Sequence, residues 1–244
     1  MRSHRVVGAL LAGAMAISCT GSGGAGRDST SGRKPATSEE SPARTNAGAV
    51  PVAGSAELEA RRTILFLGTS LTAGLGLDPD SAYPQRIQRK IDAAGLPYQV
   101  VNAGVSGETS AGLLRRLDWV LKRPADVVVV ETGANDGLRG LPVTATSTTI
   151  GSVLDRIRRD RPAATLLLVQ MEALPNMGQD YTRAFHEMFA TLAKEHGATL
   201  MPFLLENVAG QASLNQNDGM HPNNAGERIV ANNVWRSLQP ILVR

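Results

Sequence analysis

Five short apolar segments recur along the chain from residue 63 onward, each separated from the next by a longer segment with helical spacing. They cover residues 63–67, 98–102, 126–131, 165–169 and 199–201. Their length and their content of β-branched residues are typical of strands. The third, Asp126–Glu131, is apolar at each position between its terminal acids, so both of its faces are expected to be buried. That pattern favours a central strand of a parallel sheet.

The intervening segments predict helices over residues 83–94, 110–121, 149–159, 181–195 and 223–238. In the first of them Ile87 and Ile91 share one face, Pro84 suits a first helical turn, and Gly95 supplies a stop. The last is introduced by Pro222. Strands that alternate with helices in this order predict an α/β fold, in which helices cover both faces of a parallel sheet.

The first 60 residues have a different character. A basic start is followed by an apolar stretch that is too short to span a bilayer, which predicts an export signal over residues 1–18. Residues 19–60 are rich in Gly, Ser, Ala, Thr and Pro, and we expect a flexible tether there. The folded domain is therefore expected over residues 61–244.

Cys19, the only cysteine of the chain, directly follows the apolar stretch and the small residue Ser18. Bacterial lipoprotein signals end in an apolar pair, a small residue and the cysteine that becomes lipidated, so we predict lipidation at Cys19. Ala16 stands where such signals usually carry Leu, and an ordinary cleavable signal is the alternative. Either signal implies an exported protein of the periplasm or cell envelope, and lipidation would attach it to a membrane.

Composition excludes several classes of function. The net charge is only +3, basic residues are interspersed with acids, and aromatic residues make up 4% of the chain. These values argue against a nucleic-acid partner and against a stacking platform for bases. A single cysteine cannot form a disulfide within the chain. No His/Cys/Asp cluster has the spacing of metal ligands, so no metal or other cofactor is expected.

Polar residues with catalytic potential follow the predicted strands, where a parallel α/β sheet collects its chemistry. Among the four histidines, His221 lies in a polar loop three residues after Asp218. A carboxylate beside an imidazole can fix its tautomer and leave the other nitrogen free as a base. His186 and His196 lie in or at the end of a predicted helix, and structural roles are expected for both.

Ser70 follows the first strand and Gly68. A serine there could simply cap the next turn. The nucleophile elbow of α/β-hydrolases needs Gly two residues after the serine, where this chain has Thr72. That large class of hydrolases is therefore disfavoured.

Taken together, the loops 68–71, 103–109, 132–137 and 217–223 resemble the four sequence blocks of the SGNH, or GDSL, hydrolases. The similarity is greatest to the bacterial group of thioesterase I, lysophospholipase and arylesterase. It implies a three-layer α/β/α, flavodoxin-like fold with a central, mainly parallel five-stranded sheet. It implies a Ser70 nucleophile with His221 as base and Asp218 as orienting acid, and an oxyanion hole from Ser70, Gly107 and Asn135.

One position departs from the family pattern: Thr69 replaces the Asp that usually precedes the nucleophile. We expect altered loop support or specificity there, with activity retained. The resemblance implies a serine esterase of small or medium acyl esters, centred on arylesterase activity and including thioesters and lysophospholipids. Leu174, Pro175 and Met177 are candidates for an apolar acyl-binding wall. The alternatives are a carbohydrate O-deacetylase or acyltransferase of the cell envelope, and a non-catalytic lipid-binding lipoprotein.

Overall fold

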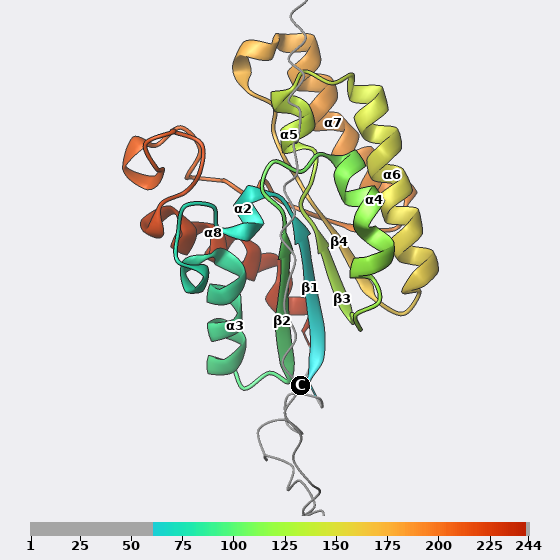
Figure 1. Ribbon diagram of the computed structural model, residues 1–244, viewed down its shortest axis with the longest axis vertical. Coiled ribbons are helices and arrows are strands. Elements are labelled where there is room, and N and C mark those ends of the chain that lie inside the picture. The colour runs from blue at the N-terminus through green and yellow to red at the C-terminus, as the bar shows by residue number, and fades with distance from the viewer. Residues whose placement is uncertain (1–60, 243–244) are drawn as a thin grey trace, which may run out of the picture. The chain divides into compact units, whose positions relative to one another are not determined.

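The computed structural model describes residues 61–242, which form a parallel five-stranded sheet between two layers of helices (Figure 1). The strands are β1 Arg62–Gly68, β2 Tyr98–Gly104, β3 Val127–Val130, β4 Thr165–Val169 and β5 Thr199–Met201. Their order is β2-β1-β3-β4-β5, and all neighbouring pairs are parallel. The predicted α/β class and five-stranded parallel sheet are confirmed.

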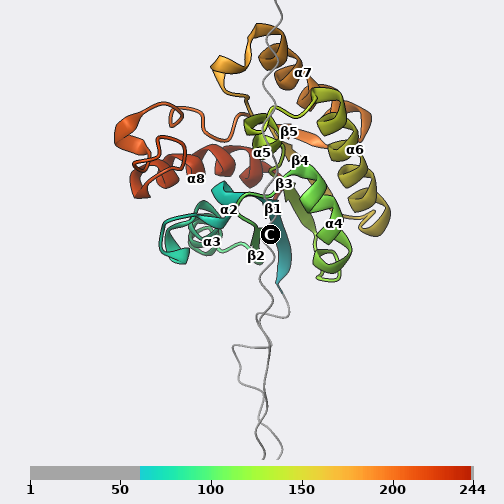
Figure 2. The ribbon, with the colours of Figure 1, turned by 45° about the horizontal axis from the view of Figure 1, so that its top comes forward.

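Two helices, α3 (Tyr83–Ala93) and α8 (Asn224–Leu238), cover one face of the sheet. The other face is covered by α4 (Ser110–Val120), α6 (Val143–Asp160) and α7 (Gln179–Glu195), as the turned view in Figure 2 also shows. Two short helices follow directly from strands at their carboxyl ends, α2 (Ser70–Ala73) after β1 and α5 (Ala134–Leu138) after β3. Single 3₁₀ turns lie at Pro79–Ser81, Pro175–Met177, Ala212–Leu214 and Gln239–Ile241.

The sheet forms the centre of the hydrophobic core. All four valines of β3 are buried, and Ile64 to Leu67 of β1 are inaccessible to solvent. Burial of one such side chain stabilises the fold by about 1.5–3 kcal/mol. Phe66 packs edge-on against Tyr83, with ring centroids 5.6 Å apart, which attaches α3 to β1. These short segments are apolar on both faces, and as central strands they bury both faces against the helix layers.

The strands β4 and β5 have the predicted bounds, and most helix ends agree to within two residues. The exception is α6, which begins at Val143, six residues before the predicted start. Its first turns are rich in threonine, which has low helix propensity and hides the apolar period. Threonine hydroxyls here donate to carbonyls one turn earlier, Thr148 to Thr144 and Thr149 to Ala145, both at 2.9 Å.

The predicted signal, the tether and Cys19 lie outside the described residues. None of the helices within 61–242 is both long and apolar enough to cross a membrane.

The direction of strand addition reverses between β1 and β3, because β2 lies on one side of β1 and β3 on the other. Loops leaving adjacent strands in opposite directions open a crevice at the carboxyl edge of such a sheet. This topology places the segments after β1 and β3, which carry Ser70 and Asn135, on the two sides of that crevice.

Candidate active site

A serine, a histidine and an aspartate form a continuous hydrogen-bonded chain at the carboxyl edge of the sheet. The Oγ of Ser70 lies 2.8 Å from Nε2 of His221, although the two residues are 151 positions apart. The Nδ1 of the same ring lies 2.7 Å from Oδ2 of Asp218. An imidazole held between a hydroxyl and a carboxylate can accept the hydroxyl proton while the carboxylate stabilises the resulting positive charge.

Ser70 is positioned by the junction of β1 and α2. Thr69, the residue before the helix, has extended backbone angles, and Ser70 is the first helical residue. Its N–H lies in the first turn, where a helix supplies no carbonyl acceptor. The Ser70 residue is 8% exposed. The Ser70 hydroxyl and the Ser70 backbone N–H therefore lie in the same buried turn.

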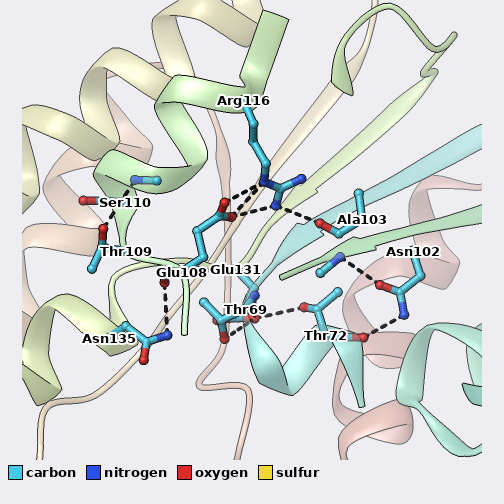
Figure 3. A network of polar contacts seen from close by, with 12 residues as sticks. Thr69, Thr72, Asn102, Ala103, Glu108, Thr109, Ser110, Arg116, Glu131 and Asn135 are labelled. Atoms are coloured by element: carbon cyan, nitrogen blue, oxygen red, sulfur yellow. Dashed lines mark hydrogen bonds and ion pairs between the residues drawn. The ribbon is translucent and has the colours of Figure 1, made fainter. Parts of the chain in front are cut away.

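A buried carboxylate, Glu131, accepts hydrogen bonds from this turn (Figure 3). Its side chain is inaccessible to solvent and accepts from the Thr69 N–H at 2.7 Å and from the Thr69 hydroxyl at 3.0 Å. It also accepts from the Thr72 hydroxyl at 2.9 Å, and Thr72 in turn lies 2.8 Å from the hydroxyl of Tyr83. Burial raises the pKa of Glu131, and the hydrogen bonds from Thr69 and Thr72 oppose that shift.

Gly68 makes the approach of Glu131 to this turn sterically feasible. A Cβ at position 68 would collide with the side chain of Thr72 and lie 2.7 Å from Oε2 of Glu131. The residue preceding Thr69 therefore has to be glycine for the carboxylate to reach the turn. Thr69, the departure from the family pattern, is a hydrogen-bond donor to this carboxylate.

The loop that carries His221 is organised by Asp218. Oδ1 of Asp218 accepts from the N–H of Met220 at 2.9 Å and of His221 at 3.0 Å, while Oδ2 contacts the imidazole. The aspartate thus forms an Asx turn and orients the ring at the same time. These hydrogen bonds, the His221 N–H first, lower the pKa of Asp218 to about 2. Its carboxylate therefore stays ionised at every pH at which an imidazole titrates.

Gln216 connects the His221 loop to the segment after α2. Its backbone N–H donates to the His221 carbonyl at 2.7 Å, and its side-chain amide donates to the Leu75 carbonyl, also at 2.7 Å. Asn223 then caps α8 by accepting from the N–H groups of Ala225 and Gly226. The histidine is fixed between the start of α8 and the turn after Ser70, which accounts for its short contact with the hydroxyl.

The predicted oxyanion residues lie in two loops that contact each other. The Asn135 amide donates to the Glu108 carbonyl at 3.0 Å, and Arg139 donates to the Gly107 carbonyl at 2.9 Å. Gly107 has a φ of 76°, and its N–H makes no hydrogen bond to any residue of 61–242. An N–H that is not engaged within the described residues, on a loop that contacts Asn135, can receive negative charge that develops on a substrate oxygen.

Two buried acids keep these loops in place. Asp136, 1% exposed, accepts from the N–H and the hydroxyl of Ser110 at 2.8 and 2.6 Å and so joins α5 to the start of α4. Glu108 forms a bidentate pair with Arg116, which also donates to the Ala103 carbonyl at 2.8 Å (Figure 3). The rigid support is expected to preserve the spacing between Gly107 and Asn135.

The acyl-wall candidates and the two helix histidines make no contact with Ser70 among the hydrogen bonds of the described residues. Leu174, Pro175 and Met177 follow β4, and the Met177 methyl group approaches Gly140 in the loop after α5; their role in binding an acyl group stays a prediction. His186 lies 2.7 Å from Glu172, and His196, the C-cap of α7, lies 2.6 Å from Asp155. Neither histidine contacts Ser70. No His/Cys/Asp/Glu group within the described part of the chain is arranged to hold a metal ion.

Two features of the site were missed by sequence reasoning. The first is Glu131. Its position directly after four valines of a buried strand could have marked it as a buried acid. The second is a set of exposed apolar side chains, here called the apolar rim, of which only Leu174 was a candidate from the sequence. It comprises six of the eight large apolar side chains that are exposed in the described region, all in segments after strand ends: Leu75, Val105, Leu138, Leu141, Leu174 and Met220.

Comparison with known proteins identifies relatives of this chain. A model of the family described as GDSL-like lipase/acylhydrolase matches residues 66–229. The chain is 38% identical over 185 residues to the esterase TesA of Pseudomonas aeruginosa, covering 75% of this chain and 90% of that protein. It is 36% identical over 181 residues to thioesterase 1/protease 1/lysophospholipase L1 of Escherichia coli K12, covering 74% and 85%.

Among solved structures, the psychrotrophic esterase EstA from Pseudoalteromonas sp., inhibited by monoethylphosphonate, superposes with a TM-score of 0.70 at 35% identity. The superposition covers 73% of this chain and 97% of that one.

Proposed function

Because the chain belongs to the GDSL-like lipase/acylhydrolase family, whose members hydrolyse ester bonds, we propose that it is a serine esterase of apolar acyl esters that works through a Ser70 acyl-enzyme. The observation that carries the proposal is the unbroken hydrogen-bonded chain from Ser70 through His221 to Asp218, with distances of 2.8 and 2.7 Å.

In the first half-reaction the Ser70 oxygen attacks the ester carbonyl while His221 Nε2 takes its proton. The bond to the leaving oxygen breaks as the tetrahedral intermediate collapses, and His221 returns the proton to that oxygen. In the second half-reaction His221 removes a proton from water as its oxygen attacks the acyl carbon; the bond from that carbon to Ser70 Oγ then breaks, His221 returns the proton to Ser70, and the carboxylic acid leaves. Asp218 fixes the tautomer throughout by accepting from Nδ1–H.

The developing oxyanion is received by the N–H of Ser70, the N–H of Gly107 and the amide of Asn135 in this proposal. The positions of these groups on adjoining loops support the assignment. The loss of one such donor in a serine hydrolase slows the reaction by about 10²–10³-fold. No metal or other cofactor enters any step.

The apolar rim supports an acyl ester with a hydrophobic chain or aryl group over an acetylated sugar. Its six side chains are 37–46% exposed and lie on the segments that follow β1, β2, β3, β4 and β5. Apolar area that is left exposed around a site is covered when an apolar substrate binds. Export through residues 1–18 and lipidation of Cys19 remain predictions that the described residues leave untested.

The nucleophile is tested by labelling with a fluorophosphonate probe. The wild-type chain and Ser152→Ala, an exposed serine on α6, should be labelled, and Ser70→Ala should not. A folded wild-type chain that resists the probe would refute the mechanism.

The substrate is tested separately with p-nitrophenyl esters of rising chain length, a palmitoyl thioester and an acetylated sugar. We expect kcat/KM to rise from acetate to medium-chain esters. Release of acetate from the sugar, with poor turnover of the free esters, would replace the acyl-ester assignment by the deacetylase alternative.

A further inference from the structure

A second concave site lies on the opposite helix layer from the oxyanion loops, between α3 and α8. It is a groove of about 340 Å³ lined by seven residues of these two helices: Arg86, Arg89, Lys90, Ala93, Arg228, Ala231 and Asn232. None of them belongs to the Ser70–His221 site. Figures 1 and 2 show α3 and α8 side by side on this face of the sheet.

Helical spacing explains why the groove is hollow in the middle and cationic along its walls. On α3, residues 86, 89, 90 and 93 share one face, and on α8 residues 228, 231 and 232 do the same. The small side chains, Ala93 and Ala231, leave the space between the helices unfilled. The long side chains of Arg89 and Arg228 rise from the same faces.

The four cations of this groove have no acidic partner. No ion pair joins Arg86, Arg89, Lys90 or Arg228 to a carboxylate within residues 61–242. The polar contacts they make are to neutral oxygens: Arg86 donates to the Ser81 carbonyl and the Asn224 side chain at 2.8 and 2.7 Å, and Arg89 to the Asp80 carbonyl at 2.9 Å.

A buried acid, Glu227, which is 1% exposed, interacts electrostatically with Arg86. Burial raises its pKa to about 8, so it is largely uncharged at neutral pH and does not neutralise the arginines. Desolvation, followed by the charges of Arg89 and Arg228, lowers the pKa of Arg86. An anion bound among these side chains would relieve that repulsion.

We propose that the α3–α8 groove binds a phosphate-bearing anion through Arg86, Arg89, Lys90 and Arg228. Guanidinium groups match phosphate oxygens with two parallel hydrogen bonds, and Lys adds a mobile point charge. The groove volume of about 340 Å³ lies at the lower end of the roughly 300–1,000 Å³ found for small-ligand pockets. It therefore has room for the organic part of a phosphate ester as well as its anionic group, whether from a soluble ester or from a lipid headgroup.

The test uses the full chain carrying Cys19→Ser, so that no lipid anchor contributes to binding. The charge-removal variant is Arg89→Gln/Arg228→Gln. The matched control is Arg115→Gln/Lys122→Gln, which removes two charges from and just after α4 on the other face. One arm titrates inorganic phosphate and follows backbone amide shifts of α3 and α8. The other measures sedimentation with vesicles of phosphatidylcholine alone or with 30% phosphatidylglycerol.

We expect phosphate to shift α3 and α8 resonances in the parent and the control, and the apparent affinity to fall at least tenfold in Arg89→Gln/Arg228→Gln. Preference for the anionic vesicles, lost in the same variant, would identify a lipid headgroup as the source. Phosphate binding without vesicle preference would identify a soluble phosphate ester. The proposal is overturned if neither probe binds or if the charge-removal variant binds as well as the control. Hydrolysis of p-nitrophenyl esters should be equal in all three proteins, which verifies folding.

Discussion

Replacing Thr69 by Asp tests how the turn that carries Ser70 is held. In the wild type the Thr69 hydroxyl lies 3.0 Å from both oxygens of the buried Glu131 and donates to it. An aspartate there removes the donor and places a second carboxyl group against the first. Two carboxylates at this separation cannot both ionise, so the pair retains a proton to a higher pH than either acid does in the unfolded chain.

The sign of the effect follows from that retained proton. A folded-state pKa above the unfolded value gives a stability contribution that is fully present below about pH 4 and is lost as pH rises through the folded pKa. Each pH unit in that window costs about 1.4 kcal/mol. Because burial already raises the pKa of Glu131 in the wild type, the difference between Thr69→Asp and wild type grows only where the folded variant holds one more proton, by up to about 1.4 kcal/mol per pH unit. For a domain of this size each kcal/mol lost lowers Tm by about 2–4 °C.

The assay is thermal and urea unfolding of the wild type, Thr69→Asp and Thr69→Asn at pH 5, 6, 7 and 8. Asparagine matches the size of aspartate, but its amide can donate to Glu131, so its difference from wild type should stay constant with pH. Comparison with wild type at each pH also cancels contributions from other titrating groups. A stability difference between Thr69→Asp and wild type that does not grow with pH would show that Glu131 is not coupled to this turn as described.

Four further predictions concern the active site, two glycines and the buried Glu227. Asp218→Asn should lower kcat on p-nitrophenyl esters by about 10³–10⁴-fold, because the amide favours the wrong imidazole tautomer; a loss below tenfold would contradict the assigned role. Gly68→Ala should cost more than the roughly 1–3 kcal/mol of simple overpacking, since it also displaces Glu131. Gly95→Ala, at a φ of 62° with no atom within 4 Å of the new Cβ, should cost only about 1–2 kcal/mol in urea unfolding. Glu227 has its pKa raised to about 8, so the stability from its protonated form is present below pH 4.5 and lost as pH rises through 8. Glu227→Gln should therefore flatten the pH dependence of unfolding between pH 5 and 8 by about 1.4 kcal/mol per unit, and equal slopes would contradict it.

Much of the fold could be predicted because its signals are local. The apolar segments 165–169 and 199–201 are strands with those bounds, and the alternation with helices predicted the parallel sheet. The start of α6 was missed because threonine-rich turns carry no apolar period. The short helices α2 and α5, of four and five residues, are too short to show a helical period.

Some features of the candidate site, like some of the fold, have local sequence signals, and others do not. Asp218 and His221 lie within four consecutive residues, so this pair could be proposed from the local sequence, whereas Ser70 and Gly107 were proposed only because four separate loops together resemble a known family. The order β2-β1-β3-β4-β5 decided that residues 151 positions apart share a hydrogen bond. Periodicity and turn chemistry describe how a segment folds but not which segment lies beside it. The partnership of Glu131 with Thr69, the apolar rim and the cationic groove between α3 and α8 were therefore decided by tertiary packing alone, because each exists only where separate elements meet.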